Sequence, residues 1–584
     1  MAKKKPKRTT QLLRWTKSVP ASEVTDPLGL GLRGSTRLAS RLLFCITSIT
    51  PRARYFSFIP WCIYNFQEHE KDQPYALGLR DAIKIRETAL TLACVLHHDG
   101  QPCDGGALVG SNKATKWDES SGEANFKDLK FAKVPALDAY YNSLVNLRCF
   151  VTDEEREDTD EEGEPIEFTF DNIELSPIGI ELATTYDSLI GRLESVRDIS
   201  SKSRKCSVSS LREWGKHGGL CELTDSAAPD QTVLRDLFFA KSSTKEDSHA
   251  VRNRSLVLIL ELCRQLSADE WCLDVQNFGM AVYYNEVVTD DEEQLKIHWP
   301  NNLTGIADRW RMFYFHHYMS VALEGMFAWL VTNVFERGIS GATTLELSES
   351  LNQSVVHQQL GEFLGCEIAE EFGLSTPADF FTAFGISTDV LNEDASKLID
   401  EGVRPKDKVA EHWLEEAIRK RTFMQSSTGL AVPMILFVQT LARYRQWANT
   451  DYGSWLATAA NDPYLDLVPP SVSLGLDRHF GEWWTCSWSV LADFVLSRYV
   501  VQQHQAMAYE KTAKGDRCLL QVDGPKVVAD LPHEKVGIGN PRFDSAIQVL
   551  TDLGLLREDD DEVTHLTEDG ASLLQAELLR QGAK

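Results

Sequence analysis

Histidine and cysteine side chains gather in one short stretch of the sequence, and metal binding is the chemistry to consider there. Cys94, His97, His98 and Cys103 carry the nitrogen and sulfur donors that zinc prefers. Their spacing matches no common zinc motif, and only Cys94 and His97 share a helical turn. We therefore expect a polar helix end here, with no metal site and no cofactor.

Four other groups contain residue types used in catalysis or phosphate binding but lack the spacing that these functions require. The pair His316-His317 with Glu324 does not follow the His-Glu-x-x-His order, so packed and hydrogen-bonded polar residues are expected. The run 533–535 contains only half of a phospholipase-D-type motif. The run 290–296 has carboxylates near a lysine, as nuclease sites do, but not in the order that such sites require. The glycine-rich run 105–113 lacks the Gly-Lys-Ser/Thr ending of a phosphate loop. No catalytic residue is predicted.

Basic residues are the remaining candidates for binding nucleic acid or another anion. The formal charge of −26 means that any contact with DNA must come from a local basic patch. The candidates are Lys3, Lys4, Lys5, Arg52, Arg54 and Arg542. Two interpretations stay open: the lysines belong to a solvated terminus or contact a partner, and the arginines are structural or contact phosphate.

The densest aromatic stretch of the chain, Thr47–Trp61, must position two of these arginines. Thr50 followed by proline at 51 is typical of a helix start. The apolar residues beyond it cover nearly the whole circumference of a helix, which predicts burial, and Pro60 predicts a kink or a break. Cations are disfavoured in a first helical turn. We therefore expect Arg52 and Arg54 to pair with carboxylates or with an anion.

A pattern of helix, short β-hairpin and helix occurs twice in the sequence. The first copy comprises a helix at 136–147, strands at 148–151 and 166–170, and a helix within 173–183. The second copy spans 540–574. Both resemble the second half of a winged-helix domain, in which the helix before the hairpin enters the DNA major groove. These helices carry almost no basic residues and both hairpins are acidic, which favours protein–protein contacts over the reading of duplex DNA.

The composition is that of a large globular protein. The chain has 584 residues, of which 43 % are hydrophobic and 25 % charged, so several domains are expected. Its twelve cysteines form no Cys-x-x-Cys motif, which indicates a reducing compartment. No signal peptide is predicted. The apolar run 430–441 is too short to span a membrane and is expected to be a core helix.

We expect a mainly α-helical, multi-domain protein with two winged-helix-like segments. The expected divisions are a flexible basic arm at 1–25, a helical domain at 26–195 that ends in a winged-helix-like segment, a linker with short helices at 196–250, a central helical domain at 251–510 and a winged-helix-like domain at 511–584.

The Thr47–Trp61 stretch also resembles the signature of an uncharacterised prokaryotic protein family whose members are often found among antiviral defence genes. Residues 26–33, 501–504, 540–542 and 550–555 resemble the same family. The resemblance covers the first 190 and last 90 residues best. It implies a cytoplasmic component of a multi-gene defence or DNA-processing system whose partners are other proteins of that system. It implies no catalytic residue.

Two functional hypotheses follow. The preferred one is a non-enzymatic binding or scaffold subunit that acts through winged-helix modules, without a membrane, and contacts DNA only if a local basic patch allows it. The alternative is a metal-dependent nuclease or other hydrolase with a site assembled from distant residues.

Overall fold

The structure is a computed structural model. It describes residues 26–30, 34–101, 108–151, 173–224, 228–239, 248–289, 293–365, 373–384, 405–420, 429–448, 475–476, 478–512, 518–533, 536, 539–559 and 563–582.

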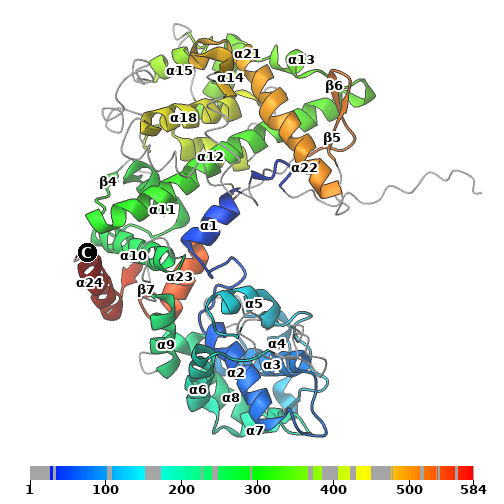
Figure 1. The fold of residues 1–584 in the computed structure, drawn as a ribbon, viewed down its shortest axis with the longest axis vertical. Helices are drawn as coiled ribbons and strands as arrows, with labels where there is room; N and C mark the ends of the chain where they lie inside the picture. The colour runs from blue at the N-terminus through cyan, green and yellow to red at the C-terminus, as the bar shows by residue number, and fades with distance from the viewer. Residues whose placement is uncertain are drawn as a thin grey trace, which may run out of the picture.

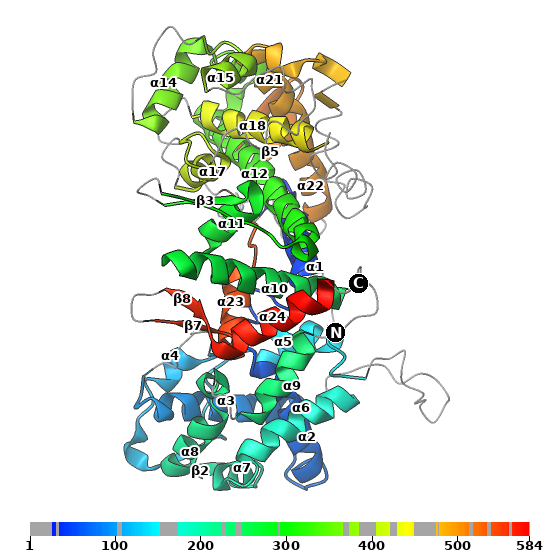
Figure 2. The same ribbon diagram turned by 90° about the vertical axis from the view of Figure 1, so that its left-hand side faces the viewer.

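The described chain is mainly helical, as predicted, and forms three stacked tiers (Figure 1; Figure 2). One continuous cluster of buried apolar side chains runs through all three tiers of the described part. The strands described pair only as short two-stranded antiparallel hairpins or ribbons. The predicted domain boundaries stay a prediction.

The lower tier is built from the N-terminal part of the chain. Here β1 (Glu123–Asn125) pairs with β2 (Lys205–Ser207). The helices are α2 (Tyr55–His69), α3 (Leu79–His97), α4 (Ser111–Ala114), η2 (Glu119–Ser121), α5 (Ala136–Asn146), α6 (Pro177–Ile190), α7 (Glu194–Ile199), α8 (Val208–Gly218), η5 (Cys221–Thr224) and α9 (Pro229–Phe238).

The middle tier combines segments from both ends of the chain, as the blue and red ribbons of Figure 1 show. Strand β7 (Leu556–Glu558) pairs with β8 (Thr564–Leu566). The helices are α1 (Thr36–Leu42), α10 (Ser248–Leu266), η6 (Ser267–Asp269), α11 (Val275–Tyr284), α23 (Phe543–Asp552) and α24 (Glu568–Gly582).

The upper tier surrounds α12 (Asn301–Glu336), which rises into it from the middle tier (Figure 2). The strand pairs are β3 (Glu286–Val288) with β4 (Gln294–Lys296) and β5 (Leu520–Asp523) with β6 (Lys526–Ala529). The other helices are η7 (Gly338–Ser340), α13 (Thr344–Ser348), α14 (Gln353–Leu364), α15 (Pro377–Ala383), α17 (Glu411–Lys420), α18 (Ala431–Ala448), η10 (Trp483–Thr485), α21 (Trp488–Val495), the π-helix η11 (Leu496–Val501) and α22 (Gln502–Thr512).

Helix α12, with 36 residues, is the longest helix of the described chain. Among the described residues it alone is long and apolar enough to cross a membrane, and 83 % of its apolar window is buried inside the protein. A core helix of a soluble protein passes the same test of length and composition. The burial of α12 is therefore explained by its packing against α10, α11, α17 and α18.

Helix α2 starts later than the sequence predicted. Its first residue is Tyr55, whereas Thr50 accepts a hydrogen bond from the amide of Thr47 at 2.9 Å instead of capping the helix. The prediction was wrong because the backbone amides of Arg52 and Ala53 donate to distant side chains, Tyr140 and Asp552, and these bonds hold the backbone outside the helix. Pro60 lies inside α2 without ending it. The tryptophan-rich stretch at 480–509 is divided among η10, α21, η11 and α22.

The second predicted helix–hairpin–helix copy is present as α23, β7, β8 and α24. In the first copy, α5 and α6 flank a bridge between Phe150 and Leu175, whereas residues 152–172 lie outside the described chain. A third such order, which the sequence did not suggest, consists of α11, β3, β4 and α12. Each first helix is followed by a left-handed residue: Arg148, Asn285 or Gly554.

The first and second copies agree in their hydrogen bonds as well as in their order of elements. A hydroxyl residue opens the second helix of each copy; its oxygen donates to the carbonyl of the left-handed residue and accepts from the amide of a glycine three positions on. These residues are Ser176, Arg148 and Gly179 in the first copy, and Thr567, Gly554 and Gly570 in the second. The two copies therefore share one local structure.

A buried carboxyl group joins α3 to the start of α5. Both oxygens of Glu87 lie 2.9 Å from the amide nitrogen of Ala136, the first residue of α5. Burial raises the pKa of Glu87 to about 8, although the Ala136 amide acts in the opposite direction. The folded protein therefore keeps this proton at pH values where an unfolded glutamate has lost it.

We expect the variant Glu87→Gln to change how stability depends on pH. Between the ordinary pKa of 4.5 and about 8, the folded state binds more protons at this site than the unfolded state, so its contribution falls as pH rises. Glutamine keeps an acceptor for Ala136 but does not titrate. As pH rises across this window, the denaturation midpoint of the variant should therefore rise relative to that of the unmodified protein. Parallel curves of midpoint against pH for the two proteins would contradict the raised pKa of Glu87. The control is Glu123→Gln, which changes a carboxylate in an exposed ion pair.

Candidate functional site

Arg52 lies between the two matching helix–hairpin–helix copies. Its Nε donates to Oδ2 of Asp552 on α23 at 3.0 Å, and its backbone amide donates to the hydroxyl of Tyr140 on α5 at 3.2 Å. The amide of Ala53 donates to the same Oδ2 of Asp552 at 2.9 Å. Burial raises the pKa of Asp552, while Arg52 and the amide act against that rise. The carboxylate partner expected for Arg52 is therefore the last residue of α23.

Arg54 is fully buried and has a carboxylate partner of its own. Its Nε and Nη2 donate to the two oxygens of Asp230 at 3.0 Å each, and its Nη1 donates to the carbonyl of Gly219 at 2.6 Å. Ser57 adds a hydroxyl bond of 2.8 Å to Asp230. Burial lowers the pKa of Arg54, but the Asp230 carboxylate more than offsets this and leaves it raised. Both arginines thus have carboxylate partners inside the protein, which favours the structural interpretation.

Arg542 differs from these two arginines because its identified acceptors are neutral. It adopts a left-handed conformation before α23, with Nη1 donating to the Ile46 carbonyl at 2.8 Å and Nη2 to the Ser40 hydroxyl at 2.7 Å. Burial lowers the pKa of its guanidinium group. Its charge is therefore not neutralised by these two contacts, and it stays a candidate for an anion. Lys3, Lys4 and Lys5 lie outside the described residues.

Segments that are far apart in the sequence lie in contact. His504 bonds through Nδ1 to the Pro27 carbonyl at 3.0 Å, and Gln503 donates to the Leu28 carbonyl at 2.9 Å. The Leu28 amide donates to Glu324 on α12 at 3.2 Å. Together with Arg52 and Arg542, these contacts tie the first described residues to the C-terminal part of the chain.

The histidine pair of α12 is buried and hydrogen-bonded. His316 Nδ1 lies 3.1 Å from the Ser35 hydroxyl, and burial lowers the pKa of His316 to about 4. His317 Nε2 lies 3.3 Å from a carboxylate oxygen of Glu415. Glu324 bonds elsewhere, to the Leu28 amide. These contacts agree with the expectation of packed polar residues.

The other motifs with catalytic residue types are only partly described. Residues 290–292 and Lys535 lie outside the described chain, and the carbonyl of His533 accepts a bond from Thr332. In the glycine-rich run, a Cβ on Gly110 would lie 2.6 Å from that of Phe131, so this glycine serves close packing.

At the C-terminal end of α3, the side chains that lie near His97 and His98 differ from those that the sequence suggested. Cys94 is fully buried and Cys103 lies outside the described residues. His97 and His98 instead lie beside Cys221, which no local sequence pattern connects with them, because more than a hundred residues separate the two segments. No protein-family model, curated protein or solved structure matches the chain.

Proposed function

We propose that this chain is a non-enzymatic binding or scaffold subunit of a cytoplasmic multi-protein system for antiviral defence or DNA processing, and that it acts through two winged-helix-like modules. The modules are α5 to α6 and α23 to α24. The observation that carries the proposal is the hydrogen-bond pattern that the two modules share. In addition, one helix of each module bonds to Arg52. The resemblance of this segment to a family found among defence genes supplies the cellular context.

The helices that would enter a DNA groove in a winged-helix domain are each packed on one face against other parts of this protein. Tyr140 of α5 is buried at the backbone of Arg52. On α23, Asp552 is buried in its ion pair, and Phe543 stacks on Phe278 of α11 with ring centroids 4.7 Å apart. A helix held on these faces has fewer side chains left for base edges. This packing supports protein binding over duplex reading as the role of the modules.

The second module borders an apolar groove that suits a partner protein. The groove encloses about 760 Å³ between β8, α24, the end of α10 and the start of α12. Leu566, Leu574 and Leu578 supply much of its apolar lining. Leu579, also at the groove, has 69 % of its surface exposed. We propose that the apolar face of a partner helix binds here, as in other helix-in-groove contacts.

The variant Leu579→Asp should weaken this complex. A charge placed at the apolar contact must be desolvated without a partner, so we expect the dissociation constant to rise at least about tenfold, or about 1.4 kcal/mol. The measurement is titration of the purified chain with each purified protein encoded beside its gene. Ile339→Asp is the matched control, because Ile339 is 99 % exposed in η7, which lies in the upper tier.

Equal weakening by both variants, or by neither, would contradict the groove as the binding surface. The scaffold role itself fails if the purified chain alone hydrolyses DNA, RNA or nucleotides with a divalent metal. That outcome would favour the hydrolase alternative.

A further inference from the structure

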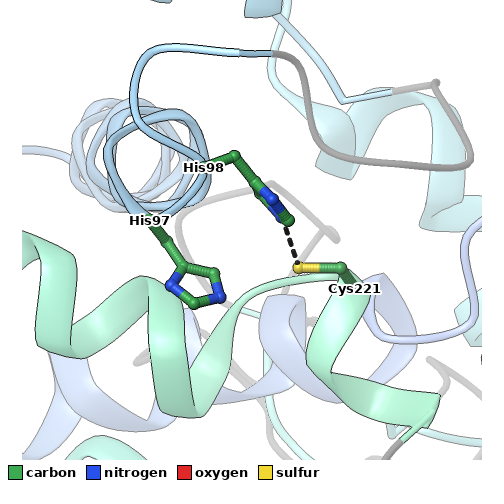
Figure 3. A group of neighbouring side chains, drawn as sticks. All are labelled: His97, His98 and Cys221. Atoms are coloured by element: carbon green, nitrogen blue, oxygen red, sulfur yellow. Dashed lines mark hydrogen bonds between the residues drawn. The ribbon is translucent and has the colours of Figure 1, made fainter.

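Two histidines at the end of α3 and one cysteine at the start of η5 form a compact group of metal-binding side chains. Figure 3 shows His97 and His98 leaving the end of α3 toward the segment that carries Cys221. One ligand atom from each of the three residues lies within 4.8 Å of the other two. All three side chains are half-buried, so an ion can reach them from solvent.

A carboxylate lies beside two members of this group, His97 and Cys221. Glu222 follows Cys221 directly, and its Oε1 lies 2.9 Å from His97 Nε2 and 3.6 Å from the sulfur of Cys221. His98 Nε2 lies 3.2 Å from the same sulfur. The set therefore offers two nitrogens, one sulfur and one oxygen.

These separations approach those of a tetrahedral zinc site. With zinc–nitrogen and zinc–oxygen bonds of about 2.0–2.2 Å and a zinc–sulfur bond of about 2.3 Å, neighbouring ligand atoms lie roughly 3.4–3.6 Å apart. The distances of 3.2 Å and 3.6 Å to the Cys221 sulfur are close to these values. The 2.9 Å between His97 and Glu222 is somewhat shorter. His97, His98 and Cys221 already lie within ligand range of one another, and the Glu222 carboxylate must turn toward His98 to become the fourth ligand.

Helix α3, which carries the histidines, is held close to α8, the helix that leads into η5. A Cβ on Gly215 of α8 would lie 2.2 Å from the Ala93 carbonyl and 2.7 Å from the Cβ of His97, so α8 crosses α3 in direct backbone contact. Arg212 of α8 also donates to the Leu96 carbonyl at 3.2 Å. These contacts fix the C-terminus of α3 relative to the cysteine. The helix dipole favours positive charge at this end of the helix, which suits a bound cation.

We propose that His97, His98, Cys221 and Glu222 bind one zinc ion. Two imidazoles, a thiolate and a carboxylate form a donor set that suits zinc, and four protein ligands make a closed, structural site. The ion would link η5 to the end of α3. This site is separate from the proposed partner groove. It shares His97 and His98 with the set that the sequence suggested but uses neither Cys94 nor Cys103.

The test is metal analysis of the full-length purified chain, followed by replacement of zinc with cobalt. We expect about one zinc per chain after dialysis, and a thiolate-to-cobalt charge-transfer band in the near ultraviolet. Cys221→Ser should abolish the band and lower zinc affinity by more than about tenfold, and His98→Gln should lower affinity likewise. Zinc should also raise the melting temperature of the unmodified chain more than that of either variant.

Two matched cysteine variants locate the bound ion. Cys272→Ser changes an exposed thiol away from the cluster, and Cys518→Ser changes a thiol 3.6 Å from His504, a second place where cysteine and histidine meet. Both variants should keep the zinc content and the cobalt band. The proposal is overturned if the unmodified chain binds no stoichiometric zinc, if the folded Cys221→Ser and His98→Gln variants bind zinc as it does, or if Cys518→Ser removes the band.

Discussion

Replacing Arg54 by methionine lowers the free energy of unfolding by about 3–5 kcal/mol, which is the expected cost of leaving one member of a buried ion pair without the other. Both side chains of the Arg54–Asp230 pair are fully buried. Methionine removes the two bonds to the Asp230 carboxylate and the bond to the Gly219 carbonyl, whereas Ser57 can compensate only in part. Denaturant unfolding followed by tryptophan fluorescence measures the change.

Three further variants separate a structural role from an anion-binding role. Arg54→Lys keeps the charge but not the planar fork that reaches both oxygens of Asp230, so it should also destabilise the protein. The double variant Arg54→Met with Asp230→Leu removes both charges and should recover most of the lost stability. Lys205→Met, at an exposed pair, should leave the unfolding midpoint unchanged. A stable Arg54→Met variant that has lost binding to DNA would contradict the structural role.

The sequence predicted that Arg52 and Arg54 need anionic partners, but it did not identify them. The carboxylates belong to Asp552 and Asp230, which lie 500 and 176 positions away in the chain. Helical periodicity and capping preferences describe only near neighbours. For the same reason the start of α2 was predicted too early: the Thr50-Pro sequence has the local features of a cap, but the long-range bonds of residues 52 and 53 decide the conformation.

The repeated helix–hairpin–helix pattern was visible in the sequence because its elements are local. Hydroxyl and glycine residues at a fixed spacing mark the start of the second helix in both copies, and the structure gives them identical bonds. The third arrangement, which ends in α12, lacks this sequence mark, because Pro300 and not a hydroxyl residue precedes its second helix. The cysteine of the proposed zinc site escaped for a different reason: the close crossing of α3 and α8 at Gly215, which brings Cys221 to the histidines, leaves no local spacing to detect.

Replacing Gly570 by alanine should destabilise the protein by about 1–3 kcal/mol or more, because the added methyl group has no room. A Cβ at this position would lie 2.1 Å from the Leu555 carbonyl oxygen, a backbone atom that cannot rotate away. Gly179→Ala should behave in the same way, because its Cβ would lie 2.1 Å from the Cys149 carbonyl oxygen. Thermal unfolding of both variants measures the effect.

The equal contacts at Gly179 and Gly570 make this pair a test of whether the two copies are one structure used twice. If they are, the two variants destabilise by similar amounts even though their neighbouring residues differ. Gly305→Ala is the control: Gly305 lies in α12 with no atom within 4 Å of the added Cβ, so alanine should instead stabilise the helix by about 1 kcal/mol. A large loss at Gly570 with none at Gly179 would mean that only the C-terminal copy needs the close approach of hairpin and helix, and the case for two equivalent modules would fail.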